Sequence, residues 1–152
     1  MVNYQDIQNN HNPFILNVQL RLADTDNLGH LNNVAYIEFL ETARTEWHAH
    51  VKESREFLDN GKWDWILGEI RIRFMKEAYL SDKLVVIMWC SRIGRKSWDF
   101  SYMMVNENED VVVIAQTSHI AYDYGNLKSK PLPNDILKDL TLRKGDRFSE
   151  FH

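Results

Sequence analysis

The order of its hydrophobic patterns constrains the fold of this chain more than any other feature of the sequence. Apolar residues alternate with mostly polar ones from Phe14 to Leu20 and predict a strand, and one long helical pattern runs from about Asn33 into the early fifties. Four further strand patterns then follow in succession, over about 66–74, 84–93, 98–104 and 111–122. Parallel strands would need helices between them, so this order predicts an α+β fold with one antiparallel, five-stranded sheet and a single central helix.

The helical pattern has one apolar face. Its apolar residues recur at helical spacing and are Tyr36, Leu40, Ala43 and Trp47, with Ile37 and Phe39 widening the stripe. A helix of about twenty residues is roughly 30 Å long, so a twisted sheet can curl around it. The edges of such a sheet stay open, which favours pairing with a second copy of the chain.

The remaining segments add little to this core. A short helix is expected from Ser54 to Leu58, closed by Asn60-Gly61, and another from Asn134 to Leu140, followed by a polar tail. Residues 1–12 are polar and expected to be loose. The 152 residues contain no internal repeat and no linker, so we expect one domain, 1–152, with a core of about 14–123 and a C-terminal helix and tail over 131–152.

Charge and composition exclude several classes of function. The chain has 18 Lys and Arg against 22 Asp and Glu, a net charge of −4, so no broad basic surface is expected for nucleic acid or a membrane surface. No apolar run is long enough to span a bilayer, and the N-terminus does not resemble a signal peptide. One cysteine, Cys90, excludes an intrachain disulfide framework and a four-cysteine zinc site and suits the reducing cytoplasm.

The most unusual segment is the loop before the long helix, Asp24-Thr25-Asp26-Asn27-Leu28-Gly29-His30-Leu31-Asn32-Asn33. One interpretation is purely structural: the two aspartates cap a turn, Gly29 supplies a positive φ, and one of the two final asparagines caps the helix. A calcium loop is disfavoured, because Leu28 and Ala35 stand where an EF-hand needs a ligand oxygen and a bidentate glutamate.

A chemical interpretation starts from the N-terminus of the helix. Unpaired N–H groups at a helix start can polarise a carbonyl group and stabilise an oxyanion, and a nearby carboxylate can act as a base toward water. Thioesters suit this equipment, because the leaving thiolate has a conjugate acid of pKa about 8.5 and needs little help from a general acid.

The run from Arg21 to Arg44, RLADTDNLGHLNNVAYIEFLETAR, resembles the signature of hotdog-fold acyl thioesterases of the 4-hydroxybenzoyl-CoA thioesterase and plant acyl-ACP thioesterase type. In that family D-x-D-x-x-G-H-x-N-N precedes the long central helix. A weaker likeness continues through 70–82 and 94–102. The resemblance implies a hotdog fold, hydrolysis of acyl-CoA, no metal or other cofactor, and a homodimer or dimer of dimers with sites at the subunit interface.

The resemblance also implies catalytic residues. Asp26 corresponds to the catalytic aspartate of the family, which acts in different members as a general base or as a nucleophile. His30 is expected to orient water or the thioester, and Asn33 to start the helix. Glu41 stands where the plant enzymes have an acidic residue on the same helix, although it could equally be solvated or paired with Arg44.

Coenzyme A carries phosphates, so an acidic chain must concentrate its cations to bind it. The expected substrate-binding cations are Arg92, Arg95, Lys96 and Lys76; a solvated strand edge blunted by charge is the alternative explanation. The family pattern is broken at Leu28, where the plant enzymes have asparagine, and at Glu77, where many relatives have proline.

Two other functions remain open on the sequence. The plant-like run from His30 to Asn33 permits acyl-ACP as the substrate, and a chain without catalytic activity could keep the fold as an acyl-CoA-binding module. Four aromatic residues could line an acyl pocket or simply belong to the core: Phe39, Trp47, Trp63 and Trp65.

Overall fold

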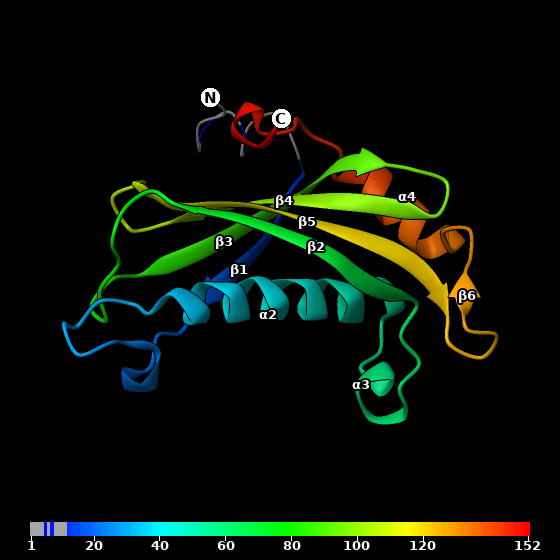
Figure 1. Cartoon of the computed structure of the whole chain (residues 1–152), viewed down its shortest axis with the longest axis horizontal. Helices are drawn as coiled ribbons and strands as arrows, with labels where there is room; N and C mark the ends of the chain where they lie inside the picture. The colour runs from blue at the N-terminus through cyan, green and yellow to red at the C-terminus, as the bar shows by residue number, and fades with distance from the viewer. Residues whose placement is uncertain (1–4, 6, 8–11) are drawn as a thin grey trace.

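A curved antiparallel sheet packs against one side of a single long helix in the computed structural model, which describes residues 5, 7 and 12–152 (Figure 1). The strands are β1 (Phe14–Val18), β2 (Trp65–Phe74), β3 (Leu84–Ile93), β4 (Ser97–Val105), β5 (Val111–Asp123) and β6 (Lys128–Ser129). Their order is β1-β3-β4-β5-β2, with β6 paired to β5. Every pair is antiparallel, which confirms the predicted class; the two-residue strand β6 was not expected.

The helices also follow the sequence closely. They are α2 (Asn33–Lys52), α3 (Glu56–Asn60) and α4 (Asn134–Leu142), and two 3₁₀ turns cover Leu22–Asp24 and Ser149–Phe151. Gly61 ends α3 with a φ of 67°, the conformation expected of a C-terminal glycine. Apart from Gln5, Ile7 and Asn12, the N-terminal segment that we expected to be loose lies outside the described residues. Among the described residues, no helix is long and apolar enough to cross a bilayer.

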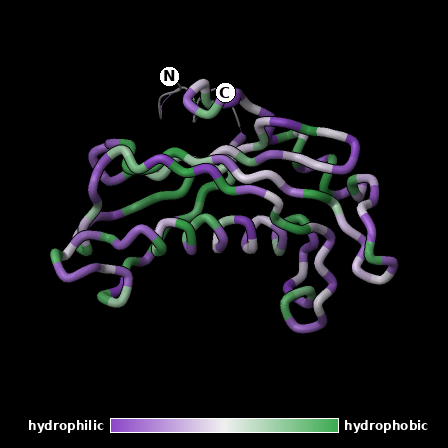
Figure 2. The backbone as a smooth tube through the Cα atoms, in the orientation of Figure 1, coloured by the Kyte–Doolittle hydropathy of each residue, from purple (hydrophilic) through white to green (hydrophobic). Residues whose placement is uncertain are grey.

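The apolar face of α2 packs on the concave face of the sheet. Leu40, Ala43 and Trp47 are fully buried, and the ring of Trp47 meets Phe100 of β4 edge-on, with ring centroids 4.8 Å apart. The indole Nε1 of Trp47 donates a hydrogen bond of 2.6 Å to Oδ2 of Asp139, so α4 is tied to the same core. The colours along α2 change between hydrophobic and hydrophilic from turn to turn, as an amphipathic helix requires (Figure 2).

The C-terminal tail covers the opposite, convex face of the sheet. Phe148 is fully buried against Trp89 of β3, with ring centroids 5.3 Å apart, and the Trp89 indole donates to the carbonyl oxygen of Asp146. The polar tail thus also contributes a buried aromatic residue, which its sequence pattern did not indicate. The tail packs there because β3 carries apolar side chains on both faces, and those on the convex face are buried by the tail.

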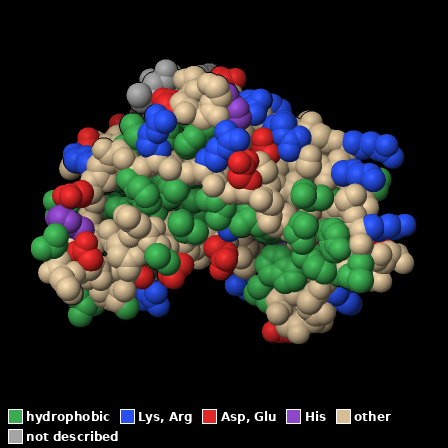
Figure 3. Space-filling model, in the orientation of Figure 1, with side chains coloured by type: hydrophobic (Ala, Val, Ile, Leu, Met, Phe, Trp, Pro, Cys, Tyr) green, Lys and Arg blue, Asp and Glu red, His purple; other side chains and the backbone are tan. Residues whose placement is uncertain are grey.

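Strand β2 forms one edge of the sheet and pairs with β5 alone among the described strands. A β-bulge between Leu67 and Glu69 breaks the regular alternation predicted for this strand. Leu67 and Phe74 stay partly exposed on it. Figure 3 shows a band of hydrophobic side chains across the face on which β2 runs.

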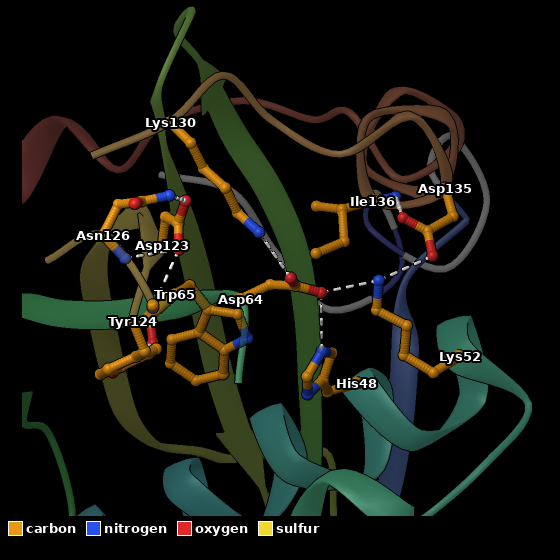
Figure 4. A network of polar contacts seen from close by, with 11 residues as sticks. His48, Lys52, Asp64, Trp65, Asp123, Tyr124, Asn126, Lys130, Asp135 and Ile136 are labelled. Carbon is orange, nitrogen blue, oxygen red and sulfur yellow. Dashed lines mark hydrogen bonds and ion pairs between the residues drawn. The ribbon is translucent and has the colours of Figure 1, made fainter. Parts of the chain in front are cut away.

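A cluster of charges around Asp64 joins the C-terminal end of α2 to the start of β2 (Figure 4). Its carboxylate lies 2.7 Å from Nζ of Lys52 and 2.7 Å from Nζ of Lys130, and its Oδ2 lies 3.9 Å from Nε2 of the buried His48. Together His48, Lys130 and Lys52 hold the pKa of Asp64 well below its usual range despite partial burial. Lys52 also contacts Asp135 of α4. Through Asp64 and Lys52, the cluster therefore links α2, the start of β2, the segment after β6 and α4.

Replacing Asp64 by asparagine should lower the free energy of unfolding by about 1–3 kcal/mol, because two lysines then lose a shared, partly buried partner. The pKa of Asp64 is lower in the folded chain than in the unfolded chain, so this loss should be complete above about pH 4 and shrink as the pH falls below that value. Urea unfolding of both chains between pH 3 and pH 7 measures it.

The control is Glu46→Gln, which removes the more exposed ion pair with Arg55 and should cost about 0–1 kcal/mol. Equal losses for the two variants would contradict a special role for the Asp64 cluster.

Candidate functional site

The two aspartates of the loop before α2 have different surroundings. Asp24 is 2% exposed; its Oδ2 accepts the backbone N–H of Arg21 at 2.8 Å, and its Oδ1 lies 3.0 Å from the Arg21 guanidinium. These hydrogen bonds from Arg21 lower the pKa of Asp24. Asp24 is therefore a structural anchor, as the turn interpretation predicts for both residues.

Asp26 is exposed, and its carboxylate is held in one orientation. Its Oδ1 accepts the backbone N–H groups of Leu28 at 2.8 Å and His30 at 3.1 Å. Gly29, at a φ of 79°, makes the tight turn between them, as expected. Within the described part of the chain, Oδ2 of Asp26 accepts no hydrogen bond, so one carboxylate oxygen is oriented and free to react.

The start of α2 leaves one backbone N–H group free. Oδ1 of Asn32 accepts from the N–H groups of Val34 at 2.8 Å and Ala35 at 3.1 Å, which settles the choice between the two asparagines: Asn32 is the N-cap. The N–H of Asn33 has no acceptor among the described residues. It lies at the positive end of a helix of 20 residues, where it can donate to a ligand oxygen.

A hollow of about 320 Å³ brings these groups together, and it is lined by Asp26, His30, Leu31, Asn33, Tyr36, Phe74, Met75, Lys76 and Glu77. Nε2 of His30 lies 3.4 Å from Oε2 of Glu77, and that same oxygen accepts a hydrogen bond of 3.2 Å from the hydroxyl of Tyr79. This hydrogen bond raises the pKa of Tyr79. Two carboxylates, Asp26 and Glu77, the imidazole of His30 and the start of α2 at Asn33 thus line one hollow.

Sequence reasoning missed part of this hollow. Glu77 stood out only as a departure from the family pattern, and Tyr36 only as a core residue; both line the hollow. They reach it from β2's end and from the second turn of α2, and no local motif links those segments to the loop. The one sequence signal for this part of the hollow was the polar residue Glu77 in the turn after the strand that ends at Phe74.

The structure brings four of the eight predicted site residues into the hollow: Asp26, His30, Asn33 and Lys76. Lys76 also contacts Oδ2 of Asp110 at 2.6 Å. Glu41 is exposed and lines a different groove together with Arg44. The two lie in no ion pair with each other among the described residues.

The other three predicted cations lie around the hairpin between β3 and β4. Arg92 is already paired with Asp99, Nε to Oδ2 at 2.9 Å, and its Nη2 donates to Ser97. Arg95 and Lys96 are exposed. Within one chain, these cations and the hollow do not share a lining.

Cys90 is fully buried, and burial raises the pKa of its thiol to about 12. A thiol that stays protonated at neutral pH is no nucleophile, which agrees with its expected role as a small core residue. The carboxylate of Asp26 is therefore the better candidate for reactive chemistry at this site.

Comparisons with known proteins converge on one family. A family model described as "Thioesterase-like superfamily" matches residues 20–140. The 1,4-dihydroxy-2-naphthoyl-CoA hydrolase of Thermosynechococcus vestitus is 28% identical over 118 residues, which cover 77% of this chain and 81% of that protein. The long-chain acyl-CoA thioesterase FadM of Escherichia coli K12 is 26% identical over 124 residues, which cover 81% of this chain and 93% of that one.

A solved structure, described as a predicted thioesterase from Bacillus stearothermophilus, superposes with a TM-score of 0.80 at 19% identity, and covers 90% of this chain and 100% of that chain. The hotdog fold implied by the motif is confirmed by this likeness together with the curved sheet around α2.

Substitution of the two adjacent asparagines, Asn32 and Asn33, should change the free energy of unfolding by different amounts. Asn32→Ala removes the acceptor of two N–H groups and should lower the free energy of unfolding by about 1 kcal/mol. Asn33→Ala, at an exposed helix position, should change it by less than about 0.5 kcal/mol. Thermal unfolding followed by circular dichroism measures both; a larger loss for Asn33→Ala would contradict the assignment of the cap.

Proposed function

Because this chain belongs to the thioesterase-like superfamily, we propose that it hydrolyses acyl-CoA thioesters and that Asp26 is its essential catalytic residue. One observation carries the proposal: a carboxylate with one free oxygen and the free N–H of a helix start, at Asn33, line the same hollow. The curated relatives described above are named for the hydrolysis of acyl-CoA thioesters.

In the proposed reaction, the thioester carbonyl oxygen accepts the N–H of Asn33, and the helix dipole stabilises the negative charge that develops on it. Oδ2 of Asp26 takes a proton from water while the water oxygen attacks the carbonyl carbon. The carbon–sulfur bond then breaks, and the proton passes to the departing thiolate. Direct attack by the carboxylate, through an anhydride, uses the same ionised Asp26 and is the alternative first step.

His30 and Glu77 are proposed to position the reacting groups. His30 contributes its backbone N–H to the Asp26 carboxylate, and its ring lies 3.4 Å from Glu77 at the edge of the hollow. The imidazole can therefore hold water or the thioester sulfur beside Asp26 without being the base itself. Lys76, in the same lining, is proposed to bind a phosphate of the substrate.

The enzyme is proposed to act as a homodimer joined along β2. The open edge of β2 and its exposed apolar residues support this arrangement, because an unpaired edge is a template for another strand. Antiparallel pairing about an axis near Ile70 would set Ile66 of one chain beside Phe74 of the partner subunit. The hairpin cations Arg92, Arg95 and Lys96 would then approach the partner's hollow, where CoA phosphates need them.

The carrier and the compartment are also part of the proposal. CoA is preferred over acyl carrier protein because the curated relatives are named for acyl-CoA, and the chain's own charge of −4 offers little attraction to an acidic carrier protein. The cytoplasm is preferred because the single cysteine forms no intrachain disulfide. Equal rates on one acyl group carried by CoA and by acyl carrier protein would contradict the first preference.

Asp26→Asn should lower kcat for an acyl-CoA that the natural chain cleaves by about 10²–10⁴-fold, because the variant has no carboxylate to accept the proton. Its melting temperature should stay close to that of the natural chain, since an amide oxygen can still accept the N–H groups of Leu28 and His30. Release of free thiol in a colour assay measures the rate.

The matched control is Asp24→Asn, in the other carboxylate of the loop. It should lower the melting temperature by disturbing the contact with Arg21 while keeping turnover within about tenfold in the folded protein. Tight acyl-CoA binding without thiol release by the natural chain would instead support a non-catalytic binding module.

Light scattering should give a mass about twice, or four times, the 18.0 kDa of one chain. Leu67→Asp, which places a charge on β2, should shift the protein toward monomer, whereas Leu142→Asp, an equally charged change on exposed α4, should not. A monomeric natural chain would refute pairing along β2.

A further inference from the structure

A second groove, of about 640 Å³, opens between α2, α3 and the start of β2 and is not used by the reaction described above. Apolar and aromatic side chains form most of its lining: Leu58, Trp63, Trp65, Ile66, Leu67 and Tyr124. Tyr124 is fixed there by a hydrogen bond from its hydroxyl to the carbonyl oxygen of Trp65, at 3.1 Å. Figure 3 shows hydrophobic side chains gathered above the loop that carries α3.

A buried cation lies in the lining of this apolar groove. Arg44 of α2 is 3% exposed, and within the described chain its guanidinium has no carboxylate within 4.0 Å. Its one hydrogen bond among the described residues runs from Nη1 to the hydroxyl of Tyr102, at 3.4 Å, and Nε has no acceptor. A buried guanidinium without a counter-ion is costly, so it calls for an anionic partner. Glu41, on the same lining, stays exposed and unpaired with it.

The polar groups behind Arg44 cannot supply this partner. Arginine only donates, so the hydroxyl of Tyr102 accepts from Arg44; the same hydroxyl is hydrogen-bonded to the hydroxyl of Thr117, which in turn is hydrogen-bonded to Nε2 of His119, both at 2.7 Å. If Tyr102 donates to Thr117 and Thr117 donates to His119, each hydroxyl proton has an acceptor, and a neutral His119 then carries its proton on Nδ1. Burial and the charge of Arg44 lower the pKa of His119 well below its usual value, so the ring is neutral.

Among the described residues, the buried donors Arg44 Nε, Trp65 Nε1 and Trp98 Nε1 have no acceptor, and Nδ1 of His119 and both ring nitrogens of His48 also have no hydrogen-bond partner. The rings of Trp65 and His119 lie 4.9 Å apart, and those of Trp98 and His119 lie 5.1 Å apart, so these rings pack together behind the groove. Arg44 and Trp65 themselves line it. A buried cation and an unpaired indole N–H whose residues share one lining are complementary to an oxyanion rather than to a methyl group or a hydroxyl.

We propose that this groove receives the far end of the acyl group and that Arg44 selects substrates whose acyl group ends in a carboxylate. This inference rests on the proposed function, and on the pairing along β2 that brings the groove of one chain beside the catalytic hollow of its partner. The thioester is cleaved at the hollow with Asp26, while the distal carboxylate replaces the missing counter-ion of Arg44 in the groove. The aromatic walls hold the apolar spacer between the two ends.

The test compares ω-carboxyacyl-CoA esters with plain acyl-CoA esters of the same carbon number, from four to ten carbons, by thiol release. At the best length, the natural chain should favour the carboxylated substrate in kcat/KM by at least about tenfold. Arg44→Met should reduce this preference by at least about tenfold, and Arg44→Lys, which keeps the cation, should retain part of it. Arg55→Met, which removes an equally charged but exposed side chain, should leave the preference unchanged.

The outcomes separate this inference from the proposed function. Thiol release from plain acyl-CoA at every length, with no preference of the natural chain for a carboxylate, overturns the role of Arg44 and keeps the thioesterase. A preference that survives in folded Arg44→Met also overturns it. Absence of thiol release from all substrates refutes the proposed function; calorimetric binding of suberoyl-CoA and octanoyl-CoA to Asp26→Asn then still decides whether Arg44 recognises the carboxylate, by the same tenfold criterion.

Discussion

The packing of α2 on the concave face of the sheet is the contact on which the rest of the structure depends. Leu40, Ala43 and Trp47 are fully buried there, so truncating Leu40 or Trp47 to alanine would open a cavity between the helix and the sheet. Because this contact fixes the helix axis, it also fixes the place of the helix start. The loop before α2 then holds Asp26 beside the first turn, so a hydrophobic contact in the core determines the geometry of a polar site at the rim.

The site divides structural and chemical tasks between neighbouring residues of similar type. Asp24 is buried against Arg21, whereas Asp26 keeps an oxygen free; Asn32 satisfies two N–H groups, whereas the N–H of Asn33 stays available. A carboxylate and a donor that are both already oriented lose little entropy when a thioester binds. The same division explains why the loop sequence fits both a turn and a reactive site: Asp24 and Asn32 stabilise the backbone that positions Asp26 and Asn33.

Features with a local cause were predictable from the sequence, and features made by distant segments were not. The bounds of α2 follow from an apolar period and a capping residue, and the place of Asp26 in the loop before the helix start follows from a dense motif. Glu77 in the hollow, the burial of Phe148 on the convex face and the contact of the buried Arg44 with Tyr102 depend on which segments the fold brings together. Arg44 and Tyr102, for example, are 58 positions apart and lie in patterns that indicate only a helix and a strand.

The central claim, that Asp26 and the helix start act together on a thioester, is tested most directly by a crystal structure of the Asp26→Asn chain with an intact acyl-CoA. We expect the thioester carbonyl oxygen within hydrogen-bond distance of the Asn33 N–H, and the carbonyl carbon within about 3–4 Å of the residue 26 side chain or of a water bound to it. A thioester bound away from the start of α2, with its carbonyl pointing to solvent, would contradict the account.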